Sequence, residues 1–146
     1  MLRLLQNDGA LESSETFHLE LLWPDGMFIA SPASTVVTIV DDDPPAALVN
    51  RVAKTGLSGE SDAELYYQIN VPPGRRTLTV STTGGSGDVD LYVGAGIVPT
   101  TSAYSCRPFR YGNRETCTFR NPVAGNYYIM LHGAEAFNGV SLSARY

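Results

Sequence analysis

The sequence predicts an all-β protein, an antiparallel β-sandwich or jelly roll with an extra β segment at its amino terminus. Fourteen glycines, nine prolines and eight tyrosines suit short strands that are joined by tight turns. No segment sustains a helical period of apolar residues, whereas several short segments alternate apolar and polar residues. Turn-forming residues separate these segments, which is typical of a sandwich.

Two strands are predicted before residue 43. In "ETFHLELLWPDG", Phe17, Leu19 and Leu21 share one face of a strand, because side chains alternate between the two faces. The "PDG" forms a turn, and "STVVTIV" is a second strand, rich in β-branched residues. Two strands alone do not make a stable core. We therefore expect residues 1–43 to pair with the rest of the chain, with a second copy in a homodimer, or with further sequence.

The composition changes at "VDDDPPAALVN". Three successive aspartates and two prolines cannot continue a central strand, because like charges repel and proline donates no hydrogen bond to a neighbouring strand. This change predicts a linker over residues 44–55, between the amino-terminal segment and a domain over residues 56–146.

The strands of the main domain follow in order as "LYYQINV", "TLTVST", "DVDLYV", "NYYIML" and "VSLSARY". The pieces "GLSG", "PPGRR", "TTGGSG" and "NPVAGN" are predicted to be surface turns. In the third strand, alternation directs Val89 and Leu91 into the core and places Asp88, Asp90 and Tyr92 on the outer face.

Charge and hydropathy exclude two classes of partner. A net charge of −5 argues against nucleic-acid binding, which needs a basic field. No apolar stretch reaches the length of a membrane span.

The start "MLRLLQND" is too short for a secretory signal, so we expect any export signal to lie on a longer precursor. One locally positive stretch stands out on this acidic chain, with four arginines: Arg107, Arg110, Arg114 and Arg120.

Two cysteines, Cys106 and Cys117, bracket ten residues. If they bond, the closed loop would stabilise the fold by about 3 kcal/mol. The alternatives are two reduced cysteines in a cytosolic protein, or half of a metal site. A metal site needs further ligands nearby, and both histidines, His18 and His132, are distant in sequence. A disulfide is favoured, and with it an oxidising compartment.

Catalytic chemistry is not indicated. A hydrolytic triad needs a histidine near a nucleophile and an orienting carboxylate, and neither histidine lies in such a context. The metalloprotease, nucleophile-elbow and phosphate-loop motifs are absent from the sequence. We therefore expect a domain that is not an enzyme.

Calcium is the cofactor that the acidic clusters suggest, since hard cations gather several oxygen ligands. The candidate ligands form three clusters: Asp41, Asp42 and Asp43; Glu60, Asp62 and Glu64; Asp88 and Asp90. The alternative for each cluster is a group of solvated charges or charges that protect a sheet edge. The aspartate triplet is the strongest candidate, because adjacent carboxylates repel unless a cation or an arginine compensates them.

Aromatic residues near the cysteines are candidates for ligand binding: Tyr92, Tyr104, Phe109 and Tyr111. Their faces could stack on a sugar ring or a peptide, and a neighbouring arginine such as Arg110 could add stacking or pair with an anion. The alternative is that these rings pack on one another and cover the base of the loop.

The chain from Gly56 to Tyr146 resembles the bacterial pre-peptidase carboxy-terminal domain, found behind the catalytic domains of secreted proteases. The resemblance rests on six motifs in order: "LYYQINVPPG", "GGSGDVDLYV", "PTTSAYSCRPF", "GNRETCTF", "AGNYYIML" and "GVSLSARY". It implies a β-sandwich, a Cys106–Cys117 disulfide and a non-catalytic appendage that is often removed during maturation. Relatives in collagenases bind collagen and carry calcium, and the region of Asp62 and Glu64 is similar to their acidic motif.

Residues 7–43 resemble the later half of a Calx-β domain, whose terminal aspartate run binds calcium together with acidic residues from other loops. Asp41, Asp42 and Asp43 match that run, and Glu15 lies in the "ETF" pattern. The resemblance implies that these four residues are calcium ligands.

These observations favour a secreted, non-catalytic accessory module of a larger bacterial hydrolase. Such a module would help its parent enzyme to bind a protein or polysaccharide substrate, or assist its export and maturation. The alternative is an adhesion or assembly module in which calcium drives self-association through the amino-terminal strands.

Overall fold

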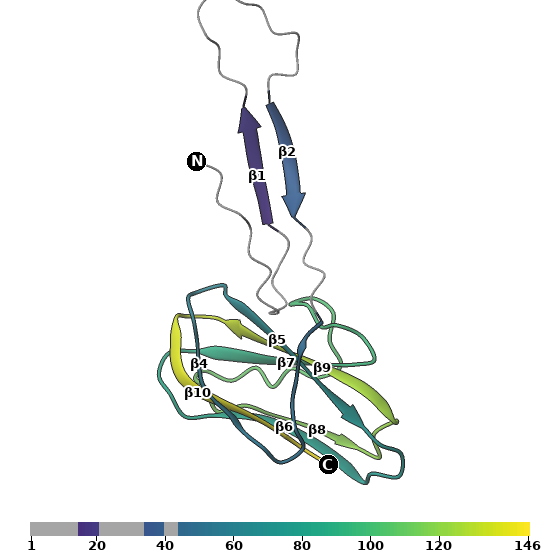
Figure 1. Cartoon of the computed structure of the whole chain (residues 1–146). Coiled ribbons are helices and arrows are strands. Elements are labelled where there is room, and N and C mark those ends of the chain that lie inside the picture. Colours follow the sequence, from purple (N-terminus) through teal and green to yellow (C-terminus); the bar gives the residue numbers. More distant parts are fainter. Residues whose placement is uncertain (1–14, 21–33, 40–43) are drawn as a thin grey trace, which may run out of the picture.

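The computed structural model describes residues 15–20, 34–39 and 44–146 (Figure 1). Every regular element in this described part is a β-strand, and they form a two-stranded sheet and two four-stranded sheets. No helix in this part is long and apolar enough to cross a membrane. The predicted all-β sandwich is confirmed.

The sandwich is built from eight strands: β3 (Ala46–Ala47), β4 (Lys54–Gly59), β5 (Glu64–Val71), β6 (Thr77–Thr83), β7 (Val89–Ala95), β8 (Thr116–Arg120), β9 (Gly125–Gly133) and β10 (Phe137–Arg145). One sheet has the order β4-β10-β6-β8 and the other has the order β3-β5-β9-β7. All pairs are antiparallel except β3 with β5. Strands β7 and β8 are therefore edge strands of different sheets, a placement that positions the candidate site.

The core lies between the two sheets and is filled by alternate residues of their strands. Val89, Leu91 and Val93 of β7 are fully buried, as are Leu78 and Val80 of β6. Burying a side chain of this size contributes about 1.5–3 kcal/mol to stability. The alternation in "DVDLYV" thus predicted correctly which side chains enter the core.

The predicted linker and one predicted turn belong to the sandwich. Within residues 44–55, β3 pairs with β5, and Leu48 is buried in the core. The segment "GLSG" lies within β4, where Leu57 is buried and pairs with Val140 of β10. This strand was predicted to be a turn because glycine is a turn signal in a sequence. In the structure the two glycines lie in a strand at the edge of its sheet.

The two amino-terminal strands pair with each other. Strand β1 (Glu15–Glu20) and β2 (Ser34–Ile39) form an antiparallel hairpin, with Phe17 opposite Val37. The strands predicted in this segment are confirmed. Among the described residues, these two strands form a sheet of their own and are not added to the sandwich.

We predict that Gly87→Ala destabilises the domain by about 2 kcal/mol. Gly87 has a φ of +89°, and an added Cβ would overlap the backbone carbonyl of Ala136. Gly74→Ala is the matched control, because its φ of +77° is similar but no atom lies within 4 Å of the added Cβ. Urea unfolding should show the larger loss for Gly87→Ala, and equal losses would mean that this close backbone approach does not form.

Candidate functional site

The chain after β7 closes the free edge of that strand. Successive edge amides donate to residues 106–115: Val89 to Asn113 Oδ1 at 3.1 Å, Leu91 to Glu115 Oε2 at 2.6 Å, and Val93 to the Cys106 carbonyl at 2.9 Å. An open edge would pair with other chains, so these bonds protect β7 from aggregation. They also fix the segment between the cysteines against the sandwich.

A disulfide joins Cys106 and Cys117, which confirms the predicted bond. Cys106 forms a β-bridge with Val93 at the edge of one sheet, while Cys117 lies in β8 of the other sheet. The disulfide therefore connects the two sheets at their edges. We refer to residues 106–117 as the cystine loop.

Three carboxylates form polar contacts of the cystine loop, two from the start of β7 and one, Glu115, from the loop itself. Glu115 is 1% exposed, and its Oε1 accepts a 2.8 Å hydrogen bond from the Arg110 amide. Asp88 accepts a 2.8 Å bond from the Gly112 amide. Asp90 pairs with the Arg107 guanidinium at 2.8 Å. Each of these acidic groups is thus engaged by the loop itself.

Burial raises the pKa of the Glu115 carboxyl above its usual value, because desolvation disfavours the charged form. Hydrogen bonds from the amides of Leu91 and Arg110 oppose this shift, since they stabilise the carboxylate. Glu115 was not among the residues singled out in the sequence. It lies in "NRETC", where nothing distinguishes a buried glutamate from a solvated one.

Aromatic and guanidinium groups stack on the outer side of β7. The Arg107 guanidinium lies 4.8 Å from the Tyr92 ring centroid and 4.0 Å from the Phe109 ring centroid. Tyr104 and Tyr92 pack in a T-shaped arrangement, with ring centroids 5.5 Å apart. Cation–π stacking of this kind holds a cation and a ring in fixed positions.

The predicted ligand-binding residues separate into two groups. Phe109 is 72% exposed and Tyr111 is 86% exposed, and Tyr104 and Arg110 are also exposed. Tyr92 lies on the outer face of its strand as expected, yet it is only 2% exposed, and Arg107 and Tyr104 pack against its ring. Tyr92 therefore contacts Tyr104 directly and is linked to Phe109 through the Arg107 guanidinium.

The described part of the chain does not assemble the predicted calcium ligands. No group of three or more His, Cys, Asp or Glu side chains in this part could hold a metal ion. Asp62 is exposed, 3.8 Å from His132 Nε2, and Glu64 accepts a 2.7 Å hydrogen bond from Tyr66. Asp41, Asp42 and Asp43 lie outside the described residues, as does the Glu15 side chain.

Comparison with known proteins places this architecture in one family. Residues 63–133 match the family described as the bacterial pre-peptidase C-terminal domain. Alkaline serine exoprotease A of Vibrio alginolyticus is 47% identical over 104 residues, which are 71% of this chain and 19% of that protein. An extracellular protease of Xanthomonas campestris is 56% identical over 99 residues, which are 68% of this chain and 17% of that protein. The chain thus spans less than a fifth of either relative.

Two solved structures share the fold. The solution structure of vEP C-ter 100 aligns with a TM-score of 0.59 at 40% identity, covering 69% of this chain and 99% of that chain. The pre-peptidase C-terminal domain of a Bacillus anthracis collagenase aligns with a TM-score of 0.54, covering 72% of this chain and 100% of that chain. Its identity is 14%, so this second likeness shows the fold alone.

These findings confirm two predictions. The pre-peptidase C-terminal domain is a non-catalytic accessory part of secreted proteases, which agrees with the prediction that this chain is not an enzyme. The predicted secreted location is confirmed by the same relatives, one of which is named an extracellular protease. This chain belongs to the bacterial pre-peptidase C-terminal domain family.

Proposed function

We propose that this chain is the carboxy-terminal accessory part of a secreted bacterial protease and holds a protein substrate beside the enzyme through the cystine loop. The protease is supported by the names of the relatives, which are an exoprotease and an extracellular protease. The observation that carries the binding role is the pair of exposed rings, Phe109 and Tyr111, at the tip of the loop.

The loop holds the Phe109 ring in a defined arrangement. Phe109 has a φ of 60°, an unfavourable backbone conformation for a bulky residue, and Arg107 packs on its ring. The disulfide and the hydrogen bonds to Glu115 hold the loop on both sides. A preorganised aromatic loses little conformational entropy on binding, so its contact area contributes to affinity.

The chemistry of the loop fits a protein surface. Aromatic and arginine side chains are enriched where proteins bind one another, and here Arg110 adjoins the two exposed rings. The depression between them, about 310 Å³, is also lined by Asp88 and Asp90. A polymeric protein such as collagen could place side chains against these rings at many points along its surface.

We predict that Phe109→Ala combined with Tyr111→Ala weakens binding of the chain to insoluble collagen by about tenfold or more, as expected for two aromatic contact residues. Co-sedimentation with collagen fibres would measure this loss, and the same assay on chitin and bacterial cell wall would test other substrates. Both side chains are exposed, so the melting temperature should change little.

A control variant carries Val52→Ala and Val123→Ala, which remove two exposed apolar side chains outside the cystine loop. This control should bind collagen as the unmodified chain does. If the unmodified chain binds none of these materials, a role in processing or export replaces substrate binding. If both double variants lose binding equally, the contact is not made by the cystine loop.

A second function is supported by the amino-terminal segment, which we propose is the later half of a Calx-β domain. Its two-stranded sheet is too small to form a core, and Val36 in that sheet is 55% exposed. Residues 1–43 carry eight carboxylates and one arginine, including the run Asp41–Asp43. Calcium bound by this run and Glu15 would link copies of the chain into a dimer.

Size-exclusion profiles of the chain with calcium and with a chelator should then differ, and identical profiles would contradict this assembly role.

A further inference from the structure

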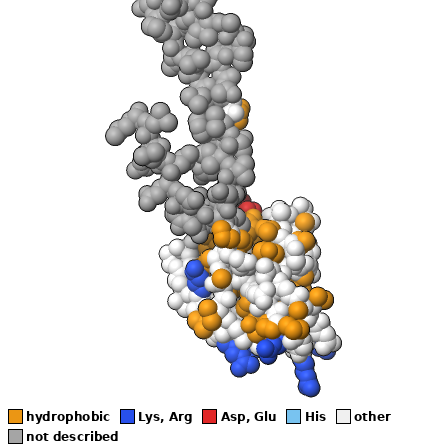
Figure 2. Space-filling model, turned by 45° about the vertical axis from the view of Figure 1, so that its right-hand side comes forward, with side chains coloured by type: hydrophobic (Ala, Val, Ile, Leu, Met, Phe, Trp, Pro, Cys, Tyr) orange, Lys and Arg blue, Asp and Glu red, His pale blue; other side chains and the backbone are white. Residues whose placement is uncertain are grey.

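A basic cleft lies on the outer face of the β4-β10-β6-β8 sheet, away from the cystine loop. Its volume is about 920 Å³, and four arginines line it: Arg51, Arg75, Arg76 and Arg145. Figure 2 shows Lys and Arg side chains gathered at the lower end of the domain, where Figure 1 places the carboxyl terminus. The four arginines come from three distant parts of the sequence, which the fold brings together.

The charge of this cleft is not neutralised by the described residues. All four arginines are exposed, no acidic residue lines the cleft, and none of the four pairs with a carboxylate in the part of the chain that the structure describes. Residues 44–146 carry nine basic and seven acidic side chains, which nearly balance. The positive charge is therefore concentrated at the cleft and is not spread over the whole domain. Four guanidinium groups in one cleft repel one another, and a bound anion would relieve that repulsion.

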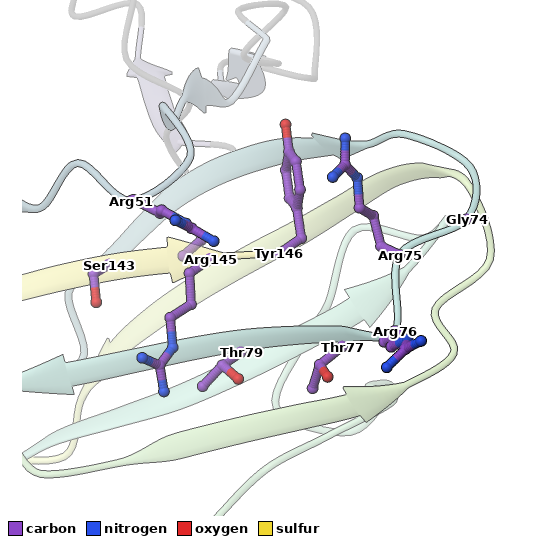
Figure 3. A pocket seen from close by; sticks show the side chains of 10 residues that line it. Arg51, Gly74, Arg75, Arg76, Thr77, Thr79, Ser143, Arg145 and Tyr146 are labelled. Atoms are coloured by element: carbon purple, nitrogen blue, oxygen red, sulfur yellow. The ribbon is translucent and has the colours of Figure 1, made fainter.

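The floor of the cleft is lined with hydroxyl groups. Thr77 and Thr79 of β6 and Ser143 of β10 line it, and Figure 3 shows the Arg145 side chain lying across β6 beside Thr79. Strands β6 and β10 are the inner strands of this sheet, and beyond Leu142 the outer side of β10 is met by the Arg51 amide, which donates to the Ala144 carbonyl. The cleft therefore offers a ligand guanidinium donors and hydroxyls.

A single aromatic ring borders the cleft. The Arg75 guanidinium lies 5.2 Å from the centroid of the Tyr146 ring, which positions this arginine at the rim (Figure 3). Protein partners are recognised mainly through clusters of apolar and aromatic side chains, which this cleft lacks. Sugar hydroxyls both donate and accept hydrogen bonds, as do threonine and serine hydroxyls, and acidic sugars also carry the anionic group that arginine binds.

From this combination we propose that the cleft binds an anionic polysaccharide. The acidic groups would pair with the guanidinium groups of Arg51, Arg76 and Arg145, while ring hydroxyls bond to Thr77 and Thr79. The cleft and the cystine loop lie on the outer sides of different sheets. The domain would thus attach to an acidic polysaccharide matrix on one side while its loop contacts protein on the other. The polysaccharide site does not depend on the function proposed for the loop.

The test titrates the full chain with polygalacturonate and with its fully methyl-esterified form, which has the same backbone without the charge. Polygalacturonate should bind, with an affinity that falls as salt is added, and the esterified form should not. Arg76→Gln and Arg145→Gln should each weaken binding by about tenfold, the loss expected for one charge-assisted contact. Arg114→Gln removes the same charge from an exposed position outside the cleft and should change affinity by less than about twofold.

Three outcomes would overturn the proposal. The first is equal binding of the charged and esterified polymers. The second is an equal loss in Arg114→Gln, which would show that only net charge matters. The third is binding of poly-L-glutamate as tightly as polygalacturonate, which would indicate an acidic peptide as the partner. Collagen binding is measured in a separate assay. A negative result with polygalacturonate therefore does not bear on the role proposed for the cystine loop.

Discussion

Replacing both cysteines, Cys106→Ala with Cys117→Ala, is expected to lower the free energy of unfolding by about 3 kcal/mol. The disulfide closes a loop with a sequence separation of 11, and the loop-entropy relation gives a stabilisation of this size. For a domain of about 100 residues, the melting temperature should fall by roughly 10–20 °C. Circular dichroism during heating would measure the change.

Chemical reduction provides the control for this prediction. A phosphine reductant should lower the melting temperature of the unmodified chain and leave that of the double alanine variant unchanged. Collagen binding by the variant should also weaken well below its melting temperature, because the loop that carries Phe109 would lose its covalent link between the two sheets. An unchanged melting temperature would mean that the bond between the two sheets adds no stability.

Much of the fold could be predicted because a strand with one buried face has apolar residues at every second position of its sequence. Val89 and Leu91 are predicted to be buried by this rule, and both are fully buried. Strand β8 is short, and Cys117 is its single buried residue, so no alternation of buried residues marks it in the sequence. Strand β4 has a single buried apolar residue, Leu57. Such strands are specified by pairing with distant residues, which a local pattern does not contain.

The candidate site was less predictable, for a related reason. Alternation places Tyr92 on the outer face of β7, but the outer face of an edge strand can still be covered by a loop from elsewhere. The arginines that cluster in the sequence, such as Arg110 and Arg114, do not form the basic cleft. Arg51, Arg76 and Arg145 do, because the sheet order places β10 between β4 and β6. Charge grouping in space follows the topology of the strands.

The edge of β7 connects stability with the proposed function. Glu115 accepts one hydrogen bond from this edge, at Leu91, and one from the loop, at Arg110. The same side chain therefore closes a sheet edge and positions the residues next to Phe109. A change at Glu115 should reduce stability, loosen the binding loop and expose an edge that can pair with other chains.

We expect Glu115→Ala to destabilise the domain by about 2–4 kcal/mol, because the buried Leu91 amide and the partly buried Arg110 amide lose their acceptor, and an unpaired buried group costs about 1–3 kcal/mol. Glu135→Ala, at an exposed position, should change stability by less than about 0.5 kcal/mol. Glu115→Gln keeps one acceptor oxygen and cannot ionise, so it isolates the effect of charge. Equal unfolding free energies for Glu115→Ala and Glu135→Ala would show that these buried hydrogen bonds do not form.

The comparison of Glu115→Gln with the unmodified chain also predicts a dependence on pH. Burial raises the pKa of Glu115 above its ordinary value of 4.5, so the folded state holds this proton more tightly than the unfolded state does. Between the ordinary and the raised pKa, the folded state binds more protons, and lowering the pH through this window stabilises it. The stability of the unmodified chain relative to Glu115→Gln should therefore rise as pH falls from neutral toward 4.5. Urea unfolding of both proteins across this range measures this difference in stability. A difference that shrinks toward acid pH would contradict the raised pKa of Glu115.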